Sequence, residues 1–176
     1  MTISIQETLQ QLARESYEVA TAKGWHENDE LDENGTPTVR QLLTWCALFH
    51  TEVTEYEQVK AHYYLDGEKP CGKITELADV AIRVWDAMGR LGFETESGGI
   101  RCGSQSVRHA IDVVIEQARI RGVHNMITLG LLNDLVDKVF DEANSIGYNL
   151  ESFVWFIKNK MAFNKSRPYR HGGRLA

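Results

Sequence analysis

The stretch ITELADVAIRVWDAM (residues 74–88) decides the fold class of this chain. At about 100° per residue, its apolar side chains point in nearly all directions around a helix, and such a helix is expected to be buried among others. One polar stripe interrupts it, at spacings of three, four and three residues: Glu76, Asp79, Arg83 and Asp86. A buried helix with one mainly acidic stripe predicts an internal ionic site. A salt-bridge network through Arg83 is the alternative interpretation.

A second acidic pair, Glu52 and Glu55, lies on the preceding predicted helix. Carboxylates three residues apart share one face of a helix, and this face is otherwise apolar. An ionised carboxylate there is costly unless it is paired or binds a metal ion. Two such helices packed antiparallel could bring four carboxylates around one divalent cation, and oxygen ligands alone favour Mg²⁺ or Mn²⁺ over zinc or copper. The predicted metal ligands are Glu52, Glu55, Glu76 and Asp79.

Helical periodicity extends over most of the chain, and glycine and proline separate the helical segments. The predicted helices cover residues 5–23, 38–64, 73–91, 104–121, 125–146 and 150–163. The polar, acidic residues 25–37 are expected to form a loop. No alternating strand pattern of useful length occurs. The fold class is therefore all-α, with one domain over residues 1–176, a length that suits a single hydrophobic core.

Charge and cysteine content exclude several classes of protein. The net charge of −6 disfavours a general nucleic-acid binder, because duplex binding depends on Lys and Arg that neutralise phosphates. Positive charge gathers in residues 158–174, which hold six basic residues and no acidic one. Three widely spaced cysteines without a C-x-x-C pair suit a reducing compartment. Since neither a membrane span nor an export signal is recognisable, the chain is expected to be soluble and cytoplasmic.

Four blocks of the sequence resemble the MazG-like superfamily of all-α nucleoside triphosphate pyrophosphohydrolases. The pattern of that family is E-x-x-E, a variable spacer and E-x-x-D, which residues 52–55 and 76–79 match. The E-x-x-E motif alone is a weak signal, but the four blocks together are fairly specific, and they imply a bundle of about six helices. The blocks are KGW (23–25), LFHTEVTE (48–55), GKITELADVAIR (72–83), and a tail with Lys160, Asn164, RPY (167–169) and HGG (171–173).

The sequence departs from the family at two places. Thr51 stands where many members carry an additional acidic residue, so Asp86 and Glu57 become candidate replacements and the number of metal ions stays open. The segment from about Glu94 to Arg121 is longer than the minimal fold needs, and its role is also open.

The resemblance implies a hydrolase that cleaves a (deoxy)nucleoside triphosphate between its α and β phosphates, with nucleotide-pool cleaning as one candidate role. The products are the monophosphate and pyrophosphate. Magnesium held by the four acidic residues would bind phosphate oxygens and activate water, which makes those residues the catalytic ones as well. A homodimer or homotetramer is expected. The predicted substrate-binding residues are Lys23, Trp25, Arg83, Lys160, Asn164, Arg167 and Tyr169.

Two other functions compete with this interpretation. A non-catalytic helical binding or assembly module would use the acidic residues in an internal salt-bridge network and the basic tail to bind a nucleic acid or an acidic partner. Cys102 and Arg108 match the C-x₅-R loop of some phosphatases, but that chemistry needs a buried strand before the cysteine, and the preceding glycines make none.

Overall fold

The computed structural model describes residues 4–92 and 105–168 of the 176-residue chain. Within these residues it contains six α-helices and one short hairpin, so the predicted all-α class is confirmed. The helices are α1 (Ile5–Ala22), α2 (Val39–Gln58), α3 (Lys73–Arg90), α4 (Val107–Arg121), α5 (Asn125–Ser145) and α6 (Leu150–Ser166). The hairpin consists of strands β1 (Tyr64–Asp66) and β2 (Lys69–Cys71).

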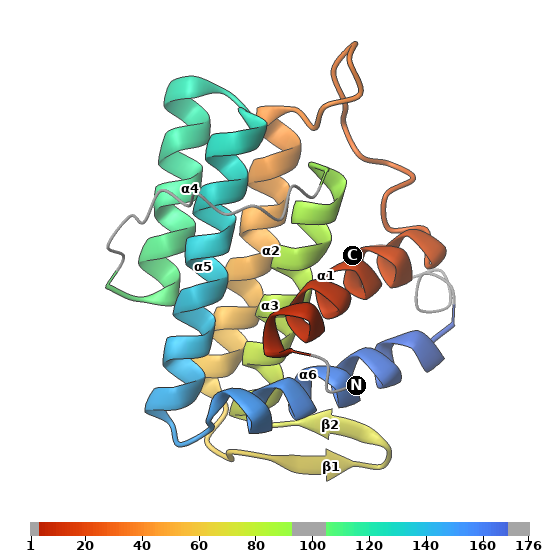
Figure 1. The fold of residues 1–176 in the computed structure, drawn as a ribbon, viewed down its shortest axis with the longest axis vertical. Coiled ribbons are helices and arrows are strands. Elements are labelled where there is room, and N and C mark those ends of the chain that lie inside the picture. The colour runs from red at the N-terminus through yellow and green to blue at the C-terminus, as the bar shows by residue number, and fades with distance from the viewer. Residues whose placement is uncertain (1–3, 93–104, 169–176) are drawn as a thin grey trace.

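Helix α3 is the centre of the molecule. It packs against α1, α2, α5 and α6, and α4 completes a ring by contacting both α2 and α5. Figure 1 shows α2 to α5 running along the long axis, with α1 and α6 crossing beside them and the hairpin at one end. Ile74, Leu77 and Val84 of α3 are completely buried. The apolar residues on all sides of α3 are therefore packed against neighbouring helices, as predicted for a helix that is apolar almost all round.

A glycine fixes the start of α3 against the segment before the hairpin. Gly72 has φ +111°, and a Cβ at this position would lie 2.7 Å from the carbonyl oxygen of His62. Any other residue would clash there and would also adopt a strained backbone conformation. Because Glu76 and Asp79 follow within two turns, this close approach helps to set the position of the acidic stripe.

The helix predicted over residues 38–64 is too long, because α2 ends at Gln58. Val59 is extended (ψ 130°), and Tyr64–Asp66 pairs antiparallel with Lys69–Cys71. Two residues, Gly67 and Glu68, connect the strands, and Gly67 has the positive φ that tight hairpin turns require. The Asp-Gly pair therefore leads into a hairpin turn rather than ending a helix, and the prediction of a helix over residues 59–64 was wrong.

The other helices agree with the prediction to within a few residues. Helix α4 begins at Val107 rather than at residue 104, because the hydroxyl of Ser106 accepts a hydrogen bond from the backbone N–H of His109 and caps the helix. Helix α6 continues to Ser166, three residues beyond its predicted end. No described helix has the length and apolar character needed to cross a membrane. Tyr169, Cys102 and residues 94–104 lie outside the described residues, whereas most of the remainder of the extra segment at 94–121 forms α4.

Candidate metal site and adjoining cavity

The structure brings three of the four predicted ligands together. Glu52 of α2 and Glu76 and Asp79 of α3 each offer a carboxylate oxygen, and these oxygens all lie within 4.8 Å of one another. Glu52 and Glu76 are each 7% exposed. Glu55, one turn further along α2, is exposed and does not belong to this group. We call Glu52, Glu76 and Asp79 the acidic cluster.

Two basic side chains contact the acidic cluster directly. Arg83 forms an ion pair with Glu52, and the ammonium of Lys160 lies 2.6 Å from Asp79 Oδ2. Lys160 comes from α6 and is only 4% exposed. Of the two alternatives that the sequence left open, the salt-bridge network through Arg83 is thus present. A metal site could use the same carboxylates.

Glu76 carries the least neutralised charge of the cluster. None of the ion pairs within the described residues involves it. Burial raises the pKa of Glu76 to about 7, and the charge of Asp79 adds to this effect while Lys160 opposes it. Burial likewise raises the pKa of Glu52 against the attraction of Arg83. The raised pKa values of Glu52 and Glu76 mean that the ionised carboxylates are poorly stabilised in this buried place. A divalent cation would supply the positive charge that stabilises them.

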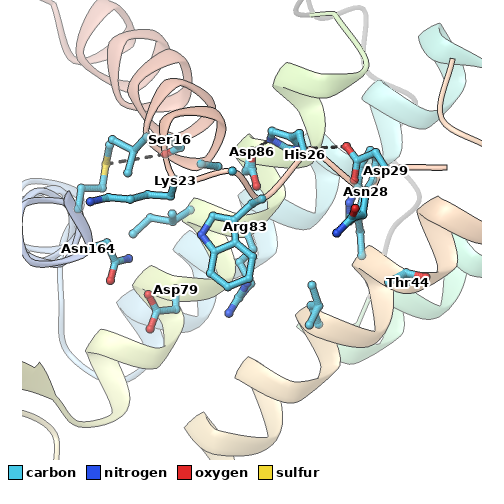
Figure 2. A pocket seen from close by; sticks show the side chains of 18 of the residues that line it. Ser16, Lys23, His26, Asn28, Asp29, Thr44, Asp79, Arg83, Asp86 and Asn164 are labelled. Atoms are coloured by element: carbon cyan, nitrogen blue, oxygen red, sulfur yellow. Dashed lines mark hydrogen bonds and ion pairs between the residues drawn. The ribbon is translucent and has the colours of Figure 1, made fainter. Parts of the chain in front are cut away.

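A cavity of about 360 Å³ adjoins the cluster, a volume within the range of small-molecule sites. It lies between the end of α1, the following loop, and helices α2, α3 and α6 (Figure 2). Asp79 belongs to both the acidic cluster and the cavity wall, and Arg83 lines the same wall. Trp25 and Trp45 also line the cavity, so apolar ring surface and charged groups face one space.

Arg167 adds a further cation to the lining of this cavity. Burial lowers the pKa of its guanidinium, an effect that Asp79 opposes and Arg83 reinforces. Two guanidinium groups that repel each other beside one cavity favour the binding of an anion, and an arginine can hold phosphate oxygens bidentately. Asn164, one turn earlier on α6, lines the cavity as well, whereas the predicted contact Tyr169 lies outside the described residues.

Lys23 lines the cavity as predicted, but its ammonium is already engaged. Its Nζ donates to the carbonyl oxygen of Lys165 at 2.8 Å and to that of Arg167. The last carbonyl groups of a helix have no partner inside the helix, and a cation there is favourable. Lys23 therefore holds the end of α6, and with it Arg167, beside the cavity.

His26 is the cavity residue that the sequence reasoning missed. Its Nδ1 lies 2.8 Å from Asp29 and its Nε2 lies 2.7 Å from Asp86, while Arg90 also contacts Asp29. Burial alone would lower the pKa of His26, but these two carboxylates outweigh that effect and raise it to about 9. The polar stripe of α3 continues from Asp86 to Arg90, but nothing in the sequence pairs it with His26, which lies 60 residues before Asp86.

The two candidate replacements for the acidic residue missing at Thr51 have other partners. Asp86 accepts the hydrogen bond from His26, and Glu57 forms an ion pair with Arg108 at 2.6 Å. Neither belongs to the acidic cluster within the described residues. Among the described residues there are therefore three clustered carboxylates and no replacement for a further one.

Comparisons with protein-family models, with curated proteins and with solved structures give no match to this chain. The described residues themselves define its class: a helical bundle with a buried carboxylate cluster beside a cavity that has basic and aromatic lining.

Proposed function

We propose that this protein is a magnesium-dependent nucleoside triphosphate pyrophosphohydrolase. The observation that carries the proposal is that Asp79 belongs both to a three-carboxylate cluster and to a cavity lined by Arg83 and Arg167. One ligand with polyphosphate and aromatic parts could use all of these groups. The resemblance to the MazG-like superfamily supports the same reaction, cleavage between the α and β phosphates.

Glu52, Glu76 and Asp79 would hold the metal ion, because their hard oxygen atoms suit Mg²⁺ and also Mn²⁺. Glu55 is exposed and outside the cluster, so it would add negative charge near the ion rather than act as a direct ligand. When bound, the ion would neutralise phosphate charge and lower the pKa of an attacking water. Arg83 and Lys160 reduce the repulsion among the carboxylates in part, and the metal ion would supply the positive charge that is still missing.

The rest of the cavity would bind the nucleotide. Arg167 and Arg83 would bind phosphate oxygens, and Asn164 could donate a hydrogen bond from the same side. Trp25 and Trp45 offer ring faces for a nucleobase. Lys23 would not contact the substrate directly. It would position Arg167 by binding the backbone carbonyl groups at the end of α6.

The proposal also covers the cellular compartment and the oligomeric state of the protein. We place the protein in the cytoplasm as a homodimer or homotetramer that acts on free nucleotides. Cys46 and Cys71 are free thiols, which suits a reducing compartment. Light scattering of the purified protein would measure the oligomeric state.

One observation favours the non-catalytic alternative. Glu52 and Asp79 each have a basic partner in direct contact, so these residues can also be interpreted as an internal ion-pair network. In that case the acidic residues would stabilise the fold and help to select a binding partner, and no activity would depend on a metal ion.

A screen of all common nucleoside and deoxynucleoside triphosphates separates these functions. The purified chain would be incubated with each nucleotide and Mg²⁺, Mn²⁺ or EDTA, with pyrophosphate detected separately from orthophosphate. We expect pyrophosphate and a monophosphate from at least one nucleotide, only when metal is present. Release of orthophosphate alone, or no release from any nucleotide, would refute the proposed reaction.

A further inference from the structure

Arg83 belongs to both halves of the proposed site. Its Nε donates a hydrogen bond to Glu52 Oε1, so the guanidinium neutralises one carboxylate of the acidic cluster. The same side chain lines the cavity, as do Asp79 and Asp86 of the same helix (Figure 2). Arg83 therefore has two possible partners, a carboxylate of the cluster and the phosphates of a bound nucleotide.

The charge balance of the acidic cluster changes sign when a divalent cation binds. The three carboxylates carry three negative formal charges, and the direct contacts of Arg83 and Lys160 supply two positive ones. The metal-free cluster is therefore left with one negative charge, and a cation with two positive charges turns this into one positive charge in excess. Repulsion between the ion and the basic side chains is strong at short distance in a buried place. One of the two basic contacts then becomes unfavourable.

Of the two basic side chains, that of Arg83 has room to move. The side chain of Lys160 is 5% exposed and lies where α6 packs on α3, whereas the side chain of Arg83 is 39% exposed. The charge of Asp86, three residues after Arg83 on the same helix, attracts the guanidinium from the cavity wall. A cation in the cluster would therefore move Arg83 away from Glu52 and toward the cavity.

We infer that Arg83 competes with the metal ion for Glu52, and that metal binding releases its guanidinium to the phosphates of the substrate. In the metal-free protein the arginine stabilises the cluster in place of the ion. In the loaded protein an anion between Arg83 and Arg167 would remove the repulsion between these two groups. The inference rests on the proposed function, because that function supplies the identity of both ligands.

The test measures the affinity of the full chain for Mn²⁺ alone, without nucleotide, by electron paramagnetic resonance of the free ion. Arg83→Met removes the competing charge, so it should bind Mn²⁺ about tenfold more tightly than the unmodified chain. Arg108→Met is the matched control. The Arg108 side chain is 38% exposed and pairs with Glu57 outside the cluster, so this variant should keep the affinity of the unmodified chain.

A second measurement separates competition from simple phosphate binding. Calorimetry with Mn²⁺ measures nucleotide analogues in which a methylene group replaces the oxygen between the α and β phosphates. Arg83→Met should bind these analogues about tenfold more weakly, which is opposite to its effect on Mn²⁺ alone. Arg167→Met should weaken the analogues too but should hardly change the affinity for Mn²⁺, because no ion pair joins Arg167 to the cluster in the described part of the chain.

NMR of the arginine Nε–H groups follows the hydrogen bond itself. The signal that is absent from the charge-conserving variant Arg83→Lys belongs to Arg83. Added Mg²⁺ should shift this signal and speed the exchange of its proton with water, because the hydrogen bond to Glu52 is lost. The signal of Arg108 should stay unchanged.

Each outcome separates this inference from the proposed function. Equal or weaker affinity of folded Arg83→Met for Mn²⁺, or an Arg83 signal that Mg²⁺ leaves unchanged, overturns the inference even if pyrophosphate is released. Tighter binding of Mn²⁺ by Arg83→Met in a protein that hydrolyses nothing supports the competition and refutes the proposed reaction. Failure of both the unmodified chain and Arg83→Met to bind Mn²⁺ refutes both.

Discussion

Lys160 and Asp79 form a buried ion pair, 2.6 Å from Nζ to Oδ2, between two helices that are far apart in the sequence. Burial alone would lower the pKa of the Lys160 ammonium, but the attraction of Asp79 outweighs it and raises the pKa above its ordinary value. Asp79 is also a proposed metal ligand. The ammonium and a divalent cation would therefore share one carboxylate.

The variant Lys160→Met should lower the free energy of unfolding by about 3 kcal/mol without metal, because it leaves Asp79 buried without its partner. Added Mg²⁺ should restore part of that loss by supplying the missing charge. Thermal melting with Mg²⁺ and with EDTA measures both effects. Lys138→Met is the matched control, since its pair with Asp141 is exposed and should contribute at most about 1 kcal/mol. An identical loss with and without Mg²⁺ would contradict the shared site.

The carboxylates should differ in importance according to their positions. Glu52→Gln and Asp79→Asn should each reduce magnesium-dependent pyrophosphate release by roughly a hundredfold or more, while the fold remains. Glu55→Gln should have a much smaller effect, because Glu55 is exposed and outside the acidic cluster. Steady-state kinetics against Mg²⁺ concentration would measure these differences. Glu57→Gln, which removes a surface charge paired with Arg108, is the control.

Full activity of Glu52→Gln or Asp79→Asn would remove the basis for the metal site. A loss in Glu55→Gln as large as in these variants would mean that the bound state draws Glu55 into the cluster.

Stability should fall as the pH rises from about 6.5 to 9. The pKa of His26 is raised from 6.5 to about 9 in the fold, so its positive charge stabilises the native state fully below 6.5 and no longer does so above 9. The charged groups around it are Asp29, Asp86 and Arg90. Urea unfolding across this pH range measures the effect.

His26→Gln should lower stability by roughly 1–3 kcal/mol at pH 6 and much less at pH 9.5, so the pH dependence should flatten. The exposed residue His109 provides the comparison, and His109→Gln should retain the slope of the unmodified chain. A slope that persists in His26→Gln would assign the titration to another group.

The variant Thr75→Val should stabilise the protein. Thr75 is 1% exposed, and its hydroxyl is the buried side-chain atom without a hydrogen-bond partner in the described part of the chain. Replacing it with a methyl group of similar shape removes a desolvation cost of about 1 kcal/mol, which corresponds to roughly 2–4 °C in melting temperature. Thr51→Val, at an exposed position of α2, should change the melting temperature little. A lower melting temperature for Thr75→Val would imply that the hydroxyl has a partner such as bound water.

The sequence could predict features that depend on residues of one helix, but not contacts between helices that are far apart in the chain. The burial of α3 was predictable because its apolar residues surround the helix, and a role for Arg83 in an internal network was predictable because it shares the stripe with the acidic residues. The pair between Lys160 and Asp79 was not, since it depends on how α6 packs across α3. No local spacing encodes that packing angle.

The errors have physical reasons as well. Glu55 follows Glu52 by three residues, the same offset that separates Glu76 from Asp79, yet Glu55 is exposed while both residues of the second pair join the cluster. The packing of α2 against α3 decides this difference, and local spacing does not encode it. The hairpin at residues 64–71 was missed because its strands have three residues each, too few for an alternating pattern. The His26 network joins a loop to α3 over 60 residues, so only the tertiary structure reveals it.

The contacts of Lys23 have a consequence for how the protein is made. Its ammonium binds carbonyl groups 142 and 144 residues later in the chain, and those carbonyls belong to the end of α6. During synthesis, α1 is made long before α6, and the contacts of Lys23 can form only after α6 has emerged from the ribosome. The nascent chain should therefore gain its binding capacity only after α6 has been made and has packed against α1.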